Sequence, residues 1–239
     1  MSDPLRQGDG GHAPTRLGLL GGTFDPIHFG HLDAAAAAQR SLALDEIRFV
    51  PSHDPPHRPS DPRASAFHRF ALVALAIEGQ PSYRASDIEL RRDGPSYTTD
   101  TLRAVHDEGW AASQIFFILG ADAFAEIATW REFPAVLDAA NFVVIARPGT
   151  SLETAAARTP ALRPRLRQTG AAAIERGGTF VFLVEAHTRD VSSTSIRARL
   201  TAGHSIDDLV PAAVARYIVA HKLYGAVSKL HGKDERVQI

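Results

Sequence analysis

The sequence predicts an α/β fold, an open parallel sheet flanked by helices on both faces, in a single domain with a small C-terminal helical part. Three observations support this prediction. The run 16–20, a helix expected over 32–44 and the run 46–51 form a βαβ unit, which implies parallel strands. The runs 114–119 and 141–146 are almost wholly apolar, which is typical of strands buried on both faces. The 239 residues, 44% of them hydrophobic, are enough to bury one core.

In the first half of the chain, the alanine run 34–38 favours the first helix. Prolines stiffen a loop over 51–59, and a further strand is expected over 83–90. A helix that reaches about Glu108 is expected to begin at Thr98 or Thr99, either of which can cap it. Another helix is expected over 65–78, with a core-facing stripe made of Phe67, Phe70, Ala71, Ala74 and Ile77.

In the second half, residues 131–140 are expected to be helical and 179–185 form the last strong strand. Residues 150–178 show no firm pattern and suggest an insert of short helices, to which the sequence assigns no function. Ser192 or Ser193 is expected to cap a helix that Gly203 ends. The remaining predictions are a capping box of Ser205 with Asp208 and a closing helix over 211–222.

Composition limits the function. The net charge is −1 and the sequence pI is about 6.8, which speaks against nucleic acid bound by charge. The absence of cysteine excludes disulfides and thiolate sites and fits a cytoplasmic protein. No apolar run approaches the roughly 18 residues of a membrane span. The three lysines, Lys222, Lys229 and Lys233, lie near the C-terminus, outside every motif. Residues 1–15 and 226–239 are expected to be disordered, leaving 16–225 as the domain.

The stretch from Gly21 to His31 connects the first expected strand to the first helix. Gly21 and Gly22 let backbone N–H groups approach a ligand closely, and the helix N-terminus favours an anion. His28 and His31 are three residues apart and share one face of a helical turn. The glycines match neither the dinucleotide fingerprint nor a P-loop. The stretch therefore predicts a phosphate site of backbone amides and two imidazoles.

Other residues are ambiguous when taken alone. His57 in the proline-rich loop is as well explained by a solvated loop as by a ligand contact. Asp122 suits a helix cap, Trp130 a core position and Arg147 a surface position. Residues 192–197 can be a well-capped helix start, or an anion site of free N–H groups, hydroxyls and Arg197.

Three motifs carry a resemblance to a known family. Residues 21–31, G-G-T-F-D-P-I-H-F-G-H, resemble the signature of nucleotidyltransferases with an H-x-G-H motif. Residues 192–197, S-S-T-S-I-R, resemble the second signature of that superfamily. Residues 89–98, E-L-R-R-D-G-P-S-Y-T, closely resemble a signature of bacterial nicotinate-nucleotide adenylyltransferases. The resemblance extends from about Leu17 to Tyr224 and matches in order at six places, the other three being the shorter segments 55–58 (P-P-H-R), 120–122 (G-A-D) and 147–148 (R-P).

The resemblance implies a Rossmann-like fold and a step of NAD biosynthesis, in which ATP and nicotinate mononucleotide give deamido-NAD and pyrophosphate. It implies direct attack of the mononucleotide phosphate on the α-phosphorus, with Mg²⁺ bound mainly through ATP. The implied catalytic residues are His28, His31 and Arg197. The implied ATP and phosphate contacts are Gly22, Thr23, Phe24, His57, Asp122, Arg147, Ser192 and Thr194. The implied contacts of nicotinate mononucleotide are Tyr97, Thr98 and Trp130, the last by stacking on the pyridine ring.

One residue departs from the pattern, because Arg131 stands where many members of the family have Tyr. Arg131 adds positive charge that can attract a carboxylate. Three alternatives to the reaction remain. The chain can use nicotinamide mononucleotide or phosphopantetheine as acceptor, it can be a nucleotide-binding module without turnover, or it can bind RNA. The segment 96–98 and Trp130 argue against the first, the intact motifs against the second and the near-neutral charge against the third.

Overall fold

The computed structural model describes residues 16–55, 63–146, 159–168 and 178–226. The expected lead-in over 1–15 and all but the first residue of the expected tail over 226–239 lie outside these residues, so both expectations stay predictions. His57 and Arg147, two of the expected phosphate contacts, also lie outside them.

In the described part of the chain, the strands form one seven-stranded sheet in the order β3-β2-β1-β4-β5-β7-β6. Every neighbouring pair is parallel. The strands are β1 (Leu17–Gly22), β2 (Glu46–Pro51), β3 (Tyr83–Ala85), β4 (Ile115–Gly120), β5 (Asn141–Ala146), β6 (Leu166–Gln168) and β7 (Val181–Glu185). The open parallel sheet that the sequence predicts is confirmed, and β2 and β5 have the predicted bounds.

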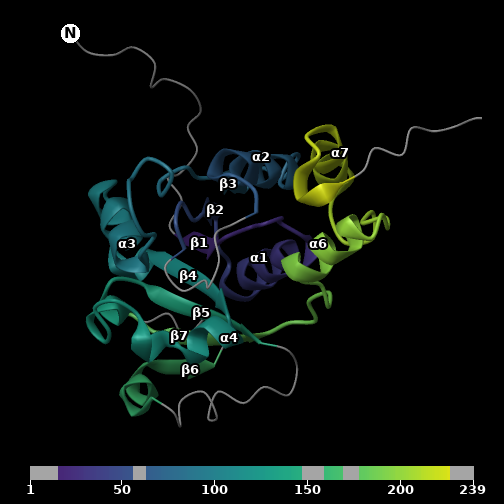
Figure 1. The fold of residues 1–239 in the computed structure, drawn as a ribbon. Helices are drawn as coiled ribbons and strands as arrows, with labels where there is room; N and C mark the ends of the chain where they lie inside the picture. Colours follow the sequence, from purple (N-terminus) through teal and green to yellow (C-terminus); the bar gives the residue numbers. More distant parts are fainter. Residues whose placement is uncertain (1–15, 56–62, 147–158, 169–177, 227–239) are drawn as a thin grey trace, which may run out of the picture.

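Helices cover both faces of this sheet (Figure 1). One core layer joins the sheet to α1 (Phe29–Leu42), α2 (Ala66–Ala76), α6 (Ser193–Thr201) and α7 (Ala212–Ala220). The other joins it to α3 (Thr98–Asp107) and α4 (Ala121–Ala125). The short 3₁₀ helices are η1 (Ala112–Gln114), η2 (Ile127–Thr129), η3 (Ala135–Asp138), η4 (Pro160–Arg165) and η6 (Leu223–Gly225). None of the helices in the described ranges is both long and apolar enough to cross a membrane.

The central strand β4 shows why its sequence is apolar throughout. Phe116 and Ile118 belong to the core layer with α1, while Ile115, Phe117 and Leu119 belong to the layer with α3. Successive side chains of a strand point to opposite faces, so burial on both faces requires an uninterrupted apolar run. The prediction from that run is confirmed.

The order of the strands reverses at β1, which pairs with β2 on one side and with β4 on the other. The chain first adds β2 and β3 on one side of β1 and then crosses back to add β4 on the other side. A crevice forms at such a point outside the carboxyl ends of the strands, where open α/β sheets bind ligands. The first motif begins with Gly21 and Gly22, the last two residues of β1, and continues beyond its carboxyl end.

The apolar stripe predicted for α2 is wrong in its register. Phe67 is 79% exposed, and the buried residues within α2 are Arg69, Leu72 and Val73. The buried face thus includes an arginine, which apolar periodicity cannot indicate. Ile77, just beyond the helix, is buried as predicted.

Several boundaries also differ from the predictions. The strand expected over 83–90 ends at Ala85. The helix expected over 131–140 is only η3, because Glu132 has a positive φ of 62° and Pro134 lacks the N–H that a helix needs. Tyr97 occupies the N-cap position of α3, in place of the predicted Thr98 or Thr99, and its side chain makes no capping hydrogen bond. The insert over 150–178 contributes the edge strand β6, which the sequence did not indicate.

Two helix ends near the C-terminus show one agreement and one difference. Gly203 follows α6 with a φ of 72°, as expected of a glycine that ends a helix. Ser205 bonds to Asp207 and not to the predicted Asp208, and Asp208 forms an ion pair with Arg199.

Candidate active site

The three segments that carry the motifs meet outside the carboxyl ends of β1 and β2. The backbone N–H of Ser52 donates to the Gly22 carbonyl (2.9 Å). The next backbone N–H, of His53, donates to Ser96 Oγ (2.8 Å), and Ser96 N–H donates to the Asp54 carbonyl (2.7 Å). The chain after β2 therefore joins the first motif to the segment that begins α3.

His28 and His31 lie together at the start of α1. His28 is the N-cap and His31 is the third helical residue, and their rings stack with centroids 3.7 Å apart and 25° between planes. The His28 backbone N–H donates to His31 Nδ1 (3.2 Å). Because Nδ1 accepts this bond, a neutral His31 carries its proton on Nε2. The predicted pairing of two imidazoles on one face of the helix is confirmed.

The environment of His28 keeps its ring uncharged. The residue is 7% exposed, and burial lowers the pKa of His28 to about 4, although the Asp33 carboxylate acts in the opposite direction. Its buried Nδ1 finds no hydrogen-bond partner within the described residues. An unpaired buried polar atom costs free energy, which a polar ligand group at this position would recover.

Two glycines of the first motif make room for neighbouring rings. A Cβ at Gly30 would lie 3.1 Å from His28 Nδ1, and one at Gly22 would lie 3.1 Å from the Phe24 ring. Phe24 is only 1% exposed and packs edge-on against the His31 ring, with centroids 5.0 Å apart. Any contact of Phe24 with a phosphate must therefore come from its backbone, while its side chain supports His31.

Asp25 and Arg197 join the two signature motifs. The Arg197 Nη1 atom donates to the Asp25 carbonyl (2.7 Å) and lies 3.7 Å from Asp25 Oδ2. The Asp25 carboxylate, 3% exposed, also accepts the backbone N–H groups of Arg63 (2.8 Å) and Ala64 (3.0 Å). Burial, and then the nearby Asp25 carboxylate, raise the pKa of Tyr224. One buried carboxylate thus links segments from three distant parts of the chain.

The start of α6 lies against the first motif. Ser193 Oγ donates to the Pro26 carbonyl (2.9 Å). Ser192 is the N-cap and its hydroxyl accepts from Ser195 N–H (3.1 Å), which decides between the two predicted caps. Thr194 Oγ1 accepts from Arg197 Nη2 (3.2 Å). The N-termini of α1 and α6 therefore lie close together, and both favour negative charge.

The buried Arg69 side chain holds the first motif and the segment after β2 together. This residue was not identified from the sequence. Its guanidinium donates to the carbonyls of Thr23 (2.7 Å), Ala64 (3.2 Å) and His53 (3.2 Å). The side chain is 1% exposed, and a buried guanidinium needs such acceptors. The available signal was an arginine within a largely apolar helical segment.

The predicted pyridine-binding residues lie at the start of α3 and after η2. Tyr97 is the N-cap of α3 and Thr98 its first residue. One turn further along α3, Thr101 Oγ1 donates to Glu89 Oε1 (2.5 Å). Burial raises the pKa of Glu89. Trp130 is partly buried and meets Phe117 edge-on, with centroids 6.0 Å apart. Trp130 is thus supported by the core while part of its surface reaches solvent.

Asp122 lies in the first turn of α4, just past the carboxyl end of β4, and is exposed. It therefore borders the same edge of the sheet as the motifs. Gly120, and not Asp122, is the N-cap of α4.

The described residues contain no group of three or more His, Cys, Asp or Glu side chains that could bind a metal ion. The buried carboxylate of the site, Asp25, already accepts two backbone N–H groups. This donor set fits a Mg²⁺ ion that is carried by phosphate oxygens and water, which Mg²⁺ commonly retains.

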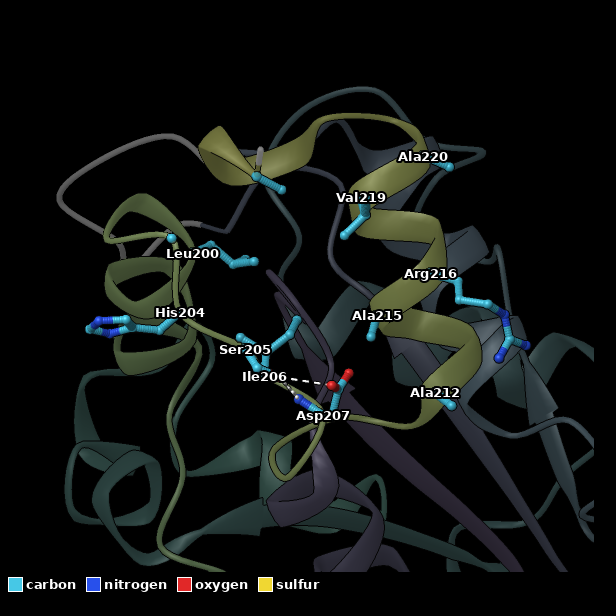
Figure 2. Close-up of a pocket in the computed structure, with 12 residues that line it drawn as sticks. Leu200, His204, Ser205, Ile206, Asp207, Ala212, Ala215, Arg216, Val219 and Ala220 are labelled. Atoms are coloured by element: carbon cyan, nitrogen blue, oxygen red, sulfur yellow. Dashed lines mark hydrogen bonds between the residues drawn. The ribbon is translucent and has the colours of Figure 1, made fainter. Parts of the chain in front are cut away.

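A cavity of about 680 Å³ lies elsewhere, between the C-terminal half of α6, α7 and the turn that joins them (Figure 2). Apolar side chains form much of its lining, including Leu200, Ile206 and Val219. At this place Ser205 Oγ and Asp207 are hydrogen-bonded to each other (2.8 Å). The motifs lie at the opposite end of α6, so this cavity is separate from the candidate active site.

Comparisons with known proteins agree with this geometry. The family model for cytidylyltransferase-like proteins matches residues 19–199. A probable nicotinate-nucleotide adenylyltransferase of Pseudomonas aeruginosa is 42% identical over 211 residues, 88% of this chain and 98% of that protein. One from Roseiflexus is 40% identical over 208 residues, 87% of this chain and 97% of that protein.

Among solved structures, the nicotinic acid mononucleotide adenylyltransferase of Plasmodium falciparum complexed with NaAD superposes with a TM-score of 0.66. It is 18% identical and covers 89% of this chain and 98% of its own. At that identity the likeness shows the fold alone, an α/β domain with a Rossmann-like sheet.

Proposed function

Because the chain belongs to the nicotinate-nucleotide adenylyltransferases, nucleotidyltransferases of NAD biosynthesis, we propose that it joins AMP from ATP to nicotinate mononucleotide. The products are deamido-NAD and pyrophosphate. The observation that carries the site assignment is the connection of the two motifs: Arg197 binds Asp25, and the N-termini of α1 and α6 meet beside the paired imidazoles.

The proposed reaction is a direct displacement. The phosphate of the mononucleotide attacks the α-phosphorus of ATP in line, the bond to the bridging oxygen breaks, and pyrophosphate leaves with the electron pair. A phosphate monoester is already a nucleophile, so the protein needs no covalent intermediate. Its task is to position the two substrates and stabilise the charge of the transition state.

His31 and His28 are proposed to act on the transferring and leaving phosphates. The proton on His31 Nε2 can donate to a phosphate oxygen. His28 is neutral in the free protein because burial lowers its pKa to about 4, and an arriving triphosphate would favour its protonated form. Ser192, Thr194 and Arg197 at the start of α6 bind further phosphate oxygens.

Mg²⁺ is proposed to be bound mainly by the triphosphate, whose charge it would screen. Gly22 and Thr23 contribute backbone groups beside ATP, and Asp122 a carboxylate at the same edge of the sheet. His57 and Arg147 complete the proposed phosphate contacts. Tyr97, Thr98 and Trp130 are proposed to bind the nicotinate ring and its carboxylate. A cytoplasmic location is part of the proposal, since ATP and pyridine mononucleotides are metabolites of that compartment.

The test is pyrophosphate release with ATP and Mg²⁺, measured in parallel with nicotinate mononucleotide, nicotinamide mononucleotide and phosphopantetheine. We expect turnover mainly with nicotinate mononucleotide. Turnover mainly with another acceptor would contradict the roles of Tyr97, Thr98 and Trp130 while leaving the phosphate chemistry intact. Nucleotide binding without pyrophosphate release would favour a binding module without turnover.

A further inference from the structure

Four charged side chains link the first turn of α3 to the segment after Trp130. Arg131 Nη1 lies 3.2 Å from Asp100 Oδ2, and Arg103 Nη1 lies 2.6 Å from Asp100 Oδ1. Arg103 Nη2 and Arg131 Nε lie 2.6 and 3.7 Å from Glu132 Oε1. The set contains two positive and two negative charges, so its net charge is zero and removing one member leaves a charge uncompensated.

Asp100 occupies a position that affects any anion bound at the start of α3. It is the third residue of the helix, where a carboxylate interacts favourably with the helix N-terminus. A carboxylate of a ligand at the same end would be repelled by it. The Thr99 hydroxyl is also buried at this helix start, and the described residues provide no hydrogen-bond partner for it.

Arg131 contacts both Asp100 and Tyr97, one of the proposed pyridine-binding residues. Its Cζ atom is 4.8 Å from the centroid of the Tyr97 ring, which places the guanidinium beside the N-cap of α3. Arg131 also follows Trp130 directly, so it is attached to both parts of that site. Arg103 is five residues further along α3 than Thr98 and reaches Asp100 from within the helix.

We infer that Arg131 sets the preference for the acid over the amide substrate, by neutralising Asp100 at the start of α3. This inference rests on the proposed function. Nicotinate and nicotinamide mononucleotides share their ribose and phosphate and differ in one group, a carboxylate against a neutral amide. A charge at the start of α3 therefore acts on one substrate and hardly on the other.

The experiment compares kcat/KM for the two mononucleotides in four variants. In Arg131→Gln we expect kcat/KM for nicotinate mononucleotide to fall about three- to tenfold, because both partners are partly exposed and such charges act modestly. The value for nicotinamide mononucleotide should stay unchanged. In the double variant Arg131→Gln with Asp100→Asn, the ratio should return towards the wild-type value.

Two further variants control for structure and for charge. Arg131→Lys keeps the positive charge without the planar guanidinium over Tyr97, and it should keep most of the selectivity. Arg199→Gln removes an arginine that forms a 3.1 Å ion pair with Asp208, beyond the motif end of α6. Both substrates should react with this variant as with the wild type.

Three outcomes would overturn the inference. An unchanged ratio in Arg131→Gln would remove Arg131 from specificity. An equal loss for both substrates, with lysine failing to preserve activity, would show that Arg131 only positions Trp130. Failure of Asp100→Asn to restore the ratio would show that Arg131 does not act through Asp100. Failure of the proposed function is recognised separately, because wild-type protein would then not turn over nicotinate mononucleotide.

Discussion

The two ends of the candidate active site are built in different ways. At the phosphate end, buried side chains bind backbone atoms: Asp25 accepts two N–H groups, and Arg69 donates to three carbonyls. At the pyridine end, partly exposed charges bind one another across Arg131, Asp100 and Glu132. The first kind of contact tolerates little change, because removing one partner leaves a buried group unpaired.

The difference suggests a division of roles. The phosphate end fixes chemistry that is the same for every acceptor, and its geometry is set by buried contacts between distant segments. The pyridine end selects the acceptor, and its exposed ion pairs contribute little to stability. We therefore expect substitutions at the phosphate end to change kcat or stability strongly, and those at the pyridine end to change KM and selectivity.

The largest effect is expected for His31→Ala. Loss of a positioned donor to a phosphate oxygen should lower kcat on the order of 10²-fold or more with the fold intact, as checked by pyrophosphate release and by circular dichroism. His68→Ala is the matched control, because His68 lies on α2 and binds the Tyr217 hydroxyl (3.0 Å). A folded His31→Ala variant with wild-type kcat would exclude His31 from the mechanism.

The next effect concerns the pH dependence of stability. Burial lowers the pKa of His28 to about 4 from 6.5, so between these values the unfolded chain binds more protons than the folded one. The stability linked to His28 is complete above pH 6.5 and is lost as the pH falls towards 4.

Wild-type protein should therefore lose about 2 kcal/mol more than His28→Gln between pH 7.5 and pH 5, since one pKa unit corresponds to about 1.4 kcal/mol. Urea denaturation at both pH values measures this difference. Glu89, whose pKa burial raises, contributes with the opposite sign in both proteins and cancels in the comparison. Equal pH dependence in the two proteins would contradict the buried, neutral state of His28.

The smallest effect is expected for Trp130→Ala at the pyridine end. Loss of stacking on the ring should raise KM for nicotinate mononucleotide about tenfold and leave KM for ATP unchanged, as steady-state kinetics would show. Trp110→Ala is the control, because Trp110 lies near Arg48 (5.9 Å), away from the motifs. An unchanged KM for the mononucleotide would mean that Trp130 serves the core alone.

Much of the fold and part of the site could be predicted from the sequence because their signals are local. The βαβ pattern predicted β2 and an apolar run predicted β5, both with their observed bounds, and the spacing of His28 and His31 predicted their shared face. The predictions of a strand over 83–90 and a helix over 131–140 were wrong because local propensity competes there with turns. In the second segment, the positive φ of Glu132 and the missing N–H of Pro134 do not permit a continuous helix.

The sequence by itself determined the parallel sheet, the glycine turn, the caps near Ser192 and Gly203 and the three motifs, since each depends on residues close together in the chain. Only the tertiary structure decided which distant residues meet. It buried Arg69 where an apolar stripe was expected, attached Arg197 to Asp25, and set Arg131 on Tyr97. Such contacts depend on how the layers pack, and their partners are separated by as many as 172 residues, a range over which sequence periodicity carries no information.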